Sequence, residues 1–209
     1  MIDLIALDAD DTLWENEVNY RQAEQRFREM LAPYANVEVI QRRLFEFETR
    51  NLPTFGYGIK GFVLSMIEAA LALSDGGFSG QQVQAIIDLG REMTQLPVEL
   101  LPGVAETVEA LAGRYPLMLL TKGDLLDQEA KVERSGLAGH FKYVEVVSNK
   151  DAPTYAAVLA GHGIDPARFL MVGNSLKSDV LPVVALGGQG VHIPHPLTWA
   201  HEQAPAHEA

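Results

Sequence analysis

The sequence predicts an α/β fold in which helices cover both faces of a parallel sheet and a helical domain is inserted after the first strand. Residues 2–8, IDLIALD, form a short apolar run that ends abruptly at an acid, as a buried strand would. After residue 100, short apolar runs alternate with helical stretches, a pattern typical of parallel sheets. Between residues 15 and 98 the sequence has no convincing strand pattern.

The C-terminal half supplies the rest of the predicted sheet. Short apolar runs predict further strands at residues 116–121, 143–147, 169–173 and 190–194. Helices are expected between them at residues 104–114, 125–136, 153–163 and 178–188. In such sheets, ligands bind beyond the carboxyl ends of the strands.

The insert is expected to be entirely helical. Its predicted helices span residues 15–34, 39–50, 61–74 and 79–93. The last begins with Ser79 and has Gln82 three residues later, which predicts a capping box. We therefore expect a core domain of residues 1–14 and 99–209 and a helical domain of residues 15–98.

Composition limits the class of protein. With 209 residues and 47% hydrophobic content, the chain can bury one good core and a smaller second domain. A net charge of −12 disfavours nucleic-acid binding, and the lack of cysteine excludes thiolate ligands and thiol nucleophiles. No signal peptide and no apolar run of the ~20 residues that span a bilayer is evident, so a cytoplasmic protein without membrane contact is expected.

Three carboxylates directly follow the first strand, at Asp8, Asp10 and Asp11, with Thr12 behind them. Carboxylates so close repel one another, and burying them is costly unless a cation compensates. We expect the chain to leave the strand between Asp8 and Asp10, and Asp11 and Thr12 suit such a turn because Asp tolerates left-handed geometry. The sequence therefore predicts a turn carrying a cation site.

The later strands also end in polar residues. Thr121 ends one predicted strand, Lys150 follows the next, and Asn174 and Asp179 follow the third. Together with Asp8 and Asp10 these form an oxygen-rich set without Cys or His, which suits Mg²⁺. We expect Asp8, Asp10, Asn174 and Asp179 to hold the metal, while Lys122 and Asp124 are expected to be structural.

This arrangement suits the hydrolysis of a phosphomonoester. The metal and Lys150 would offset the negative charge of the phosphoryl group, and Thr121 would donate a hydrogen bond to it. Asp8 would attack phosphorus to give an aspartyl-phosphate, and Asp10 would exchange protons with the leaving oxygen and with water.

The polar residues that follow four of the predicted strands resemble the four motifs of the haloacid dehalogenase-like hydrolase superfamily. Asp8, Asp10 and Thr12 match its D-x-D-x-T motif, Thr121 its second motif, Lys150 its third, and GNSLKSD, residues 173–179, a variant of its fourth. The resemblance implies a Rossmann-like core and a helical, C1-type cap formed by the insert. It also implies a Mg²⁺-dependent phosphatase that acts on a small phosphorylated metabolite, as a monomer or homodimer.

Two positions differ from some members of the superfamily, and they leave more than one activity open. Asp10 points to phosphoryl transfer, because dehalogenases of the superfamily do not usually carry this second acid. Asn174 stands where many members have Asp, so the metal site has one charge fewer. Phosphonate hydrolase, phosphomutase or dehalogenase activity remains possible, as does a non-catalytic member that binds a ligand or partner.

The insert contains one candidate for substrate contact. The glycine-rich stretch at residues 55–61 carries Tyr57 and Lys60, which we expect to bind substrate. Lys60 is also the lysine that phosphonate cleavage would use. The histidine-containing tail around Trp199 is expected to be a packed segment without a functional metal.

Overall fold

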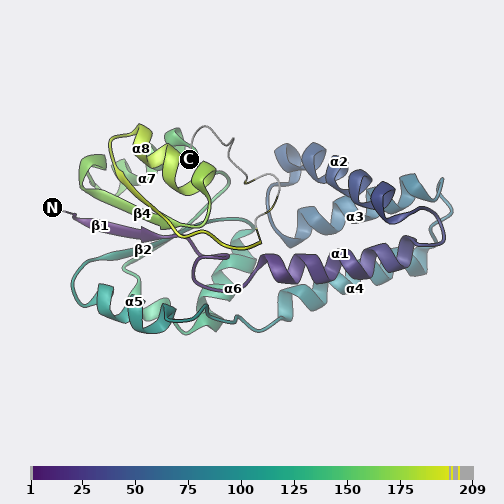
Figure 1. The fold of residues 1–209 in the computed structure, drawn as a ribbon, viewed down its shortest axis with the longest axis horizontal. Helices are drawn as coiled ribbons and strands as arrows, with labels where there is room; N and C mark the ends of the chain where they lie inside the picture. The colour runs from purple at the N-terminus through teal and green to yellow at the C-terminus, as the bar shows by residue number, and fades with distance from the viewer. Residues whose placement is uncertain (1, 198, 200–201, 203–209) are drawn as a thin grey trace. The chain divides into compact units, whose positions relative to one another are not determined.

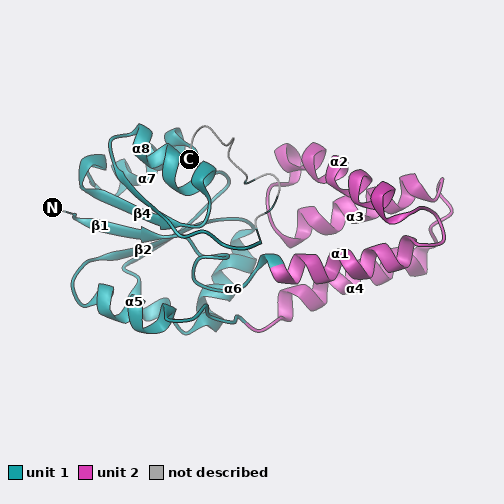
Figure 2. Cartoon of the chain, viewed as in Figure 1, with its two compact units in different colours: residues 1–17, 98–209 teal, residues 18–97 magenta. Residues whose placement is uncertain are grey.

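The computed structural model describes residues 2–197, 199 and 202. The chain divides into two compact units, residues 1–17 with 98–209 (unit 1) and residues 18–97 (unit 2) (Figure 2). Among the described helices, none combines the length and the apolar character needed to cross a membrane.

Unit 1 contains the expected parallel sheet, and the predicted fold class is confirmed. The strands are β1 (Leu4–Leu7), β2 (Leu117–Lys122), β3 (Tyr143–Val147), β4 (Phe169–Gly173) and β5 (Gln189–His192). They are ordered β3-β2-β1-β4-β5, and all neighbours are parallel. Leu7 of β1 lies level with Leu119 of β2 and Val172 of β4, so the residues that follow these three strands meet at one edge of the sheet.

Two apolar layers hold the sheet, because successive side chains of a strand point to opposite faces. Ile5 and Leu7 pack on one face with helices α5 (Val104–Ala112) and α6 (Leu125–Ser135). Leu4 and Ala6 pack on the other face with α7 (Ala152–Gly161) and α8 (Leu181–Ala185). Figure 1 shows α7 and α8 on one side of the sheet and α5 and α6 on the other. The central strand β1 is buried along its whole length, which explains its unbroken apolar sequence.

Unit 2 is helical, with α2 (Val37–Phe55), α3 (Ile59–Leu73), α4 (Gly80–Gln95) and most of α1 (Glu17–Leu31). Its core includes Phe27, Phe62 and Met66, all nearly inaccessible. The predicted capping box of α4 is confirmed: Gln82 N–H donates to the Ser79 side chain, and Ser79 N–H to the Gln82 side chain. Whether unit 2 acts as a cap stays a prediction.

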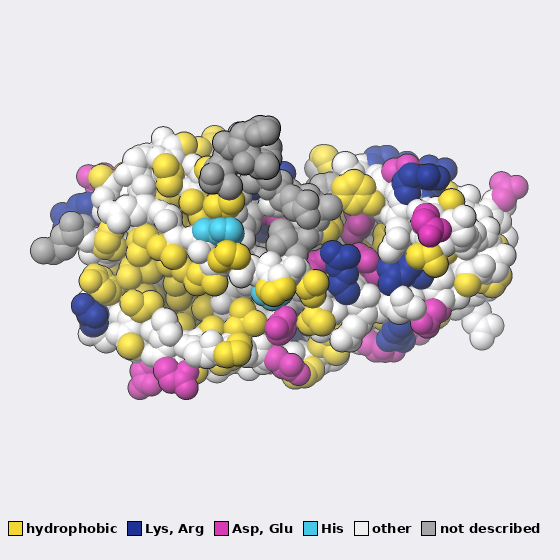
Figure 3. All heavy atoms as spheres, viewed as in Figure 1, with side chains coloured by type: hydrophobic (Ala, Val, Ile, Leu, Met, Phe, Trp, Pro, Cys, Tyr) yellow, Lys and Arg dark blue, Asp and Glu magenta, His cyan; other side chains and the backbone are white. Residues whose placement is uncertain are grey.

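Part of the hydrophobic surface of unit 1 is exposed. Figure 3 shows hydrophobic side chains gathered on the face of this unit that is turned to the viewer. Among the described residues, Val184 of α8 is exposed, as are Val191, Ile193 and Leu197 in and after the edge strand β5. The expectation of a monomer or homodimer stays a prediction.

Candidate active site

The turn after β1 positions the first two acids. Asp8 N–H still donates to the carbonyl of Val172 on β4 at 2.9 Å, and the chain then turns so that Leu13 N–H donates to the Ala9 carbonyl at 2.8 Å. Asp11 takes the left-handed conformation expected of it, with φ at 60°. The chain thus leaves the strand direction immediately after Asp8, as predicted.

Thr12 connects this turn to the end of β4. Its hydroxyl donates to Asp8 Oδ2 at 2.9 Å and accepts the backbone N–H of Asn174 at 3.1 Å. Asn174 therefore reaches the site through its backbone, while its role as a metal ligand stays a prediction.

Asp8, Lys150 and Asp179 form a buried charge cluster. The Lys150 ammonium contacts Asp8 Oδ1 and lies 2.7 Å from Asp179 Oδ1, and all three side chains are less than a tenth exposed. Burial, opposed by Lys150 and reinforced by Asp179, raises the pKa of Asp8 to about 7. Burial alone would lower the pKa of Lys150, but Asp179 and Asp8 raise it overall. The single positive charge of the buried lysine thus neutralises only part of the negative charge of the two carboxylates.

The turn after β4 fixes Asp179. A π-helical turn, Leu176–Val180, brings Asp179 back so that Ser175 N–H donates to Asp179 Oδ2 at 2.9 Å. A Cβ atom at Gly173 would lie 2.2 Å from Asp179 Oδ2. Only glycine therefore fits at the end of β4.

Asp10 binds a different set of partners from Asp8. Asp10 Oδ1 accepts from Trp14 Nε1 at 2.8 Å and Lys131 Nζ at 3.0 Å, and Oδ2 accepts from Gln128 Nε2 at 2.8 Å. Burial would raise the pKa of Asp10, but the attraction of Lys131 and these hydrogen bonds lower it overall. Asp10 is therefore held as a carboxylate, and its role as a metal ligand stays a prediction.

Sequence reasoning missed Gln128 and Lys131. Both come from α6, and Gln128 is buried one turn before the buried Val132. A polar residue at an apolar position of a helix was the available signal. Gln128 Oε1 is the buried side-chain atom left without a hydrogen-bond partner among the described residues.

Thr121 is 1% exposed and lies in register with Val146 of β3, one position beyond the level of Asp8. Asp124 is structural as expected, because it caps α6 by accepting the N–H of Asp127 at 3.2 Å. Lys122, which was also expected to be structural, contacts Glu202 of the C-terminal segment and Ser178.

Glu202 completes a group that the sequence did not reveal. Its Oε2 accepts from the hydroxyls of Ser175 at 2.7 Å and Ser178 at 2.5 Å, and its Oε1 contacts Lys122. Burial would raise the pKa of Glu202, but Lys122 and the two hydroxyls lower it to about 2. We call Lys122, Ser175 and Ser178 the carboxylate pocket. A single acid in a polar tail gives no sequence signal for such a contact.

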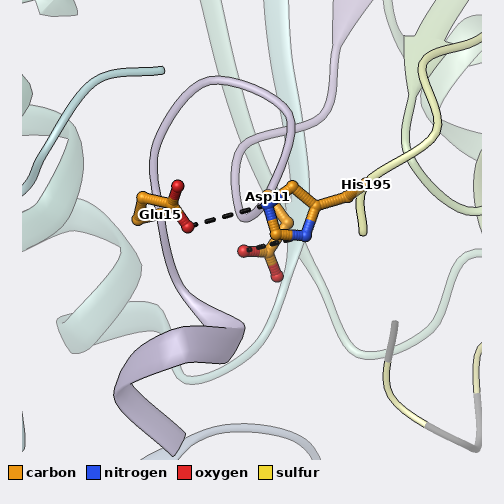
Figure 4. A group of neighbouring side chains, drawn as sticks. All are labelled: Asp11, Glu15 and His195. Atoms are coloured by element: carbon orange, nitrogen blue, oxygen red, sulfur yellow. Dashed lines mark ion pairs between the residues drawn. The ribbon is translucent and has the colours of Figure 1, made fainter. Parts of the chain in front are cut away.

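A second acidic group lies in the turn itself. Asp11, Glu15 and His195 have potential ligand atoms within 4.8 Å of one another (Figure 4). His195 Nδ1 lies 3.9 Å from Asp11 and Nε2 lies 3.6 Å from Glu15. However, Asp11 Oδ1 already accepts the N–H groups of Asn16 and Glu17, at 2.9 and 3.0 Å, so this acid also serves to hold the turn.

The chemistry of the donor set around Asp8 fits a hard divalent cation. Its charged ligands are carboxylate oxygens, and the single Lys150 ammonium lies between two of these carboxylates, Asp8 and Asp179. Asp8, Asp10, Asn174 and Asp179 stay the residues predicted to hold Mg²⁺ at this edge.

The two predicted substrate contacts belong to unit 2. Tyr57 lies half-buried in the loop between α2 and α3, and Lys60 is exposed in the first turn of α3. The stretch is thus partly helical, and the substrate contact of both residues stays a prediction.

Comparison with known proteins places this geometry in context. Residues 2–187 match the family described as haloacid dehalogenase-like hydrolase. A haloacid dehalogenase-like family hydrolase from Xanthomonas campestris is 47% identical, with a TM-score of 0.89 over 93% of this chain and 82% of that one. A 2-haloacid dehalogenase from Pseudomonas syringae pv. Tomato DC3000 is 26% identical, with a TM-score of 0.64 over 98% and 92% of the two chains.

A curated relative is pyrimidine 5'-nucleotidase YjjG of Escherichia coli (strain K12), which is 31% identical over 94 residues. That match spans 42% of this chain and 41% of the relative. Similar proteins thus include both a 2-haloacid dehalogenase and a pyrimidine 5'-nucleotidase.

Proposed function

Because this chain belongs to the haloacid dehalogenase-like hydrolase family, and is thereby an enzyme, we propose that it is a Mg²⁺-dependent phosphatase of a small phosphomonoester. The observation that carries the proposal is the buried Asp8 carboxylate, held between Lys150 and Thr12 and followed two residues later by a second acid. This is the arrangement that a carboxylate nucleophile with a neighbouring proton carrier requires.

The reaction has two halves. Asp8 attacks phosphorus, and the bond from phosphorus to the leaving oxygen breaks. Asp10, a carboxylate in the free protein, takes up a proton when substrate binds and passes it to this oxygen. In the second half Asp10 takes a proton from water, whose oxygen attacks phosphorus and releases phosphate and the Asp8 carboxylate. Lys150 and Thr121 bind the phosphoryl oxygens, and bound Mg²⁺ would neutralise phosphoryl charge.

The substrate is proposed to be a small phosphorylated metabolite. Unit 2 would act as the cap that selects it, through Tyr57 and Lys60. The net charge of −12 disfavours a nucleic-acid partner. A cytoplasmic location and a monomeric or homodimeric state complete the proposal.

The test is a panel of phosphorylated metabolites assayed with Mg²⁺, with Asp8→Asn as the blank. We expect release of phosphate that stops when EDTA removes the metal and returns when Mg²⁺ is added. Phosphate release from no member of the panel, or full activity after exhaustive chelation, would contradict the proposal.

The role of Asp10 as the proton carrier can be tested separately. We expect Asp10→Asn to lower kcat by about 10²- to 10⁴-fold, the usual contribution of general acid–base catalysis. Asp11→Asn should be mild, because Asn also tolerates a positive φ and its oxygen can accept the same N–H groups. Steady-state kinetics of both variants checks this, and a larger defect in Asp11→Asn would reverse the assignment.

One observation favours haloacid dehalogenation as a second candidate. Lys131, Gln128 and Trp14 hold Asp10 ionised, whereas protonation of a leaving oxygen needs it protonated. A halide leaves without a proton, so Asp8 could displace it from carbon and water could then hydrolyse the ester. Halide release from 2-chloropropionate that persists in EDTA, without phosphatase activity, would favour this candidate.

A further inference from the structure

The carboxylate pocket holds the Glu202 carboxylate by both of its oxygens. Lys122 contacts Oε1, and the hydroxyls of Ser175 and Ser178 donate to Oε2. The Lys122 and Glu202 side chains are 15% and 14% exposed, so the contact is largely removed from water. Three donors arranged on one carboxylate make a specific site, because charge-assisted hydrogen bonds are stronger than neutral ones.

Unit 1 positions these donors through contacts that do not involve Glu202. Ser178 N–H donates to Ser175 Oγ at 3.0 Å, and Lys122 Nζ donates to Ser178 Oγ at 2.9 Å. The Tyr155 hydroxyl donates to the Ser178 carbonyl at 3.0 Å. Burial lowers the pKa of Lys122, and Glu202 opposes that shift. A buried ammonium beside two hydroxyls therefore favours an anionic occupant.

The pocket adjoins the nucleophile cluster. Lys122 directly follows Thr121, and Ser178 directly precedes Asp179. Ser175 N–H donates to Asp179 Oδ2, and Asp179 in turn binds the same lysine as Asp8. The charges of Lys150 and Asp179 also act on Lys122, so the pocket lies beside the cluster at which the phosphoryl group is proposed to bind.

We propose that the carboxylate pocket binds the carboxylate of the substrate and that Glu202 occupies it in the free enzyme. This rests on the proposed phosphatase reaction and names the substrate class, a small phosphorylated hydroxy acid. A carboxylate is the group of choice because the structure shows one in place, with each oxygen bound. Glu202 then competes with the substrate for Lys122, Ser175 and Ser178.

The experiment compares two esters, 2-phosphoglycolate and ethyl phosphate, which differ in a carboxylate and a methyl group. Lys122→Met should lower kcat/KM for 2-phosphoglycolate about tenfold or more relative to ethyl phosphate, because the lost ammonium binds only the carboxylated ester. Lys177→Met removes an exposed lysine from the same turn as Ser178 and serves as the control. It should leave the ratio unchanged.

Glu202→Gln provides an independent measurement, because it weakens the internal competitor without touching the donors. KM for 2-phosphoglycolate should fall severalfold, and the exposed substitution Glu109→Gln should leave it unchanged. Wild-type enzyme that hydrolyses no phosphate ester would overturn the proposed function. Turnover of both esters with a ratio insensitive to Lys122→Met, or a KM insensitive to Glu202→Gln, would overturn the pocket assignment alone.

Discussion

Asp8→Asn should lower phosphatase turnover by at least about 1000-fold while the protein still folds. An amide is far too weak a nucleophile to attack phosphorus, and removing a nucleophile removes the whole covalent route. The structure gives a reason for the retained fold: Lys150 keeps its contact with Asp179 when the Asp8 charge is removed. Burst and steady-state phosphate release measure the loss.

The same variant has a pH signature in stability. The pKa of Asp8 is about 7 in the folded protein and 3.8, the ordinary value of an aspartate, in the unfolded chain, so between these values the folded state binds a proton that the unfolded state releases. Stability from this group is therefore fully present below about pH 3.8 and is lost as pH rises through about 7. Compared with wild type, Asp8→Asn should gain in Tm as pH rises from 5 to 8.

Asp3→Asn is the matched control, since Asp3 lies just before β1 and pairs with Arg168 at the surface. It should leave turnover unchanged. Turnover by Asp8→Asn within tenfold of wild type would refute the nucleophile assignment.

Lys150→Met should abolish activity and also lower the free energy of unfolding by about 3–5 kcal/mol, the usual result of breaking a buried ion pair. Without the ammonium, Asp8 and Asp179 are left as buried carboxylates with no cation between them. Adding Asp179→Asn should restore part of the lost stability, because one of the two uncompensated charges is then gone. It should restore no activity, since the phosphoryl group still lacks Lys150.

Urea unfolding of wild type, Lys150→Met, Asp179→Asn and the double variant gives a double-mutant cycle that measures the coupling between the two residues. Lys142→Met, at an exposed lysine just before β3, is the control and should cost at most about 1 kcal/mol, because it removes only an exposed cation–π contact of 5.0 Å with Tyr143. The interpretation fails if Lys150→Met costs less than about 1 kcal/mol, the range of exposed pairs, or if the double variant is no more stable than the single one.

Local patterns were the most predictable part of the fold. Buried parallel strands carry unbroken apolar runs, so β1 and β2 could be found from their own residues. The turn at Asp11 and the capping box of Ser79 followed from local backbone chemistry in the same way.

Helix boundaries set by tertiary contacts were less predictable. The second helix of the insert was expected to end at Arg50, but α2 continues to Phe55 through Pro53. Pro53 costs α2 one backbone hydrogen bond because proline has no N–H. Buried Asn51 offsets this loss, because it donates to Ser65 Oγ at 3.1 Å and to Glu68, both on α3. These contacts with the next helix stabilise the last turns.

In the candidate site, the motif residues could be located but the surroundings of Asp10 could not. Gln128 and Lys131 reach Asp10 from 118 and 121 residues away, and no local pattern reveals which acid a helix will contact. The same holds for Glu202 and Lys122, 80 residues apart. A strand-end motif indicates which side chains lie at the edge of a sheet, but not which of them a partner neutralises.

The distance along the chain between site residues also bears on how the enzyme folds. Asp8 and Lys150 are separated by 142 residues, and unit 2 is synthesised between them. Long-range contacts form late because the chain must first close a large loop. While the nascent chain lacks β3 and the residues that follow it, the Asp8 carboxylate has no lysine partner, so the reactive ion pair cannot assemble until most of unit 1 has left the ribosome.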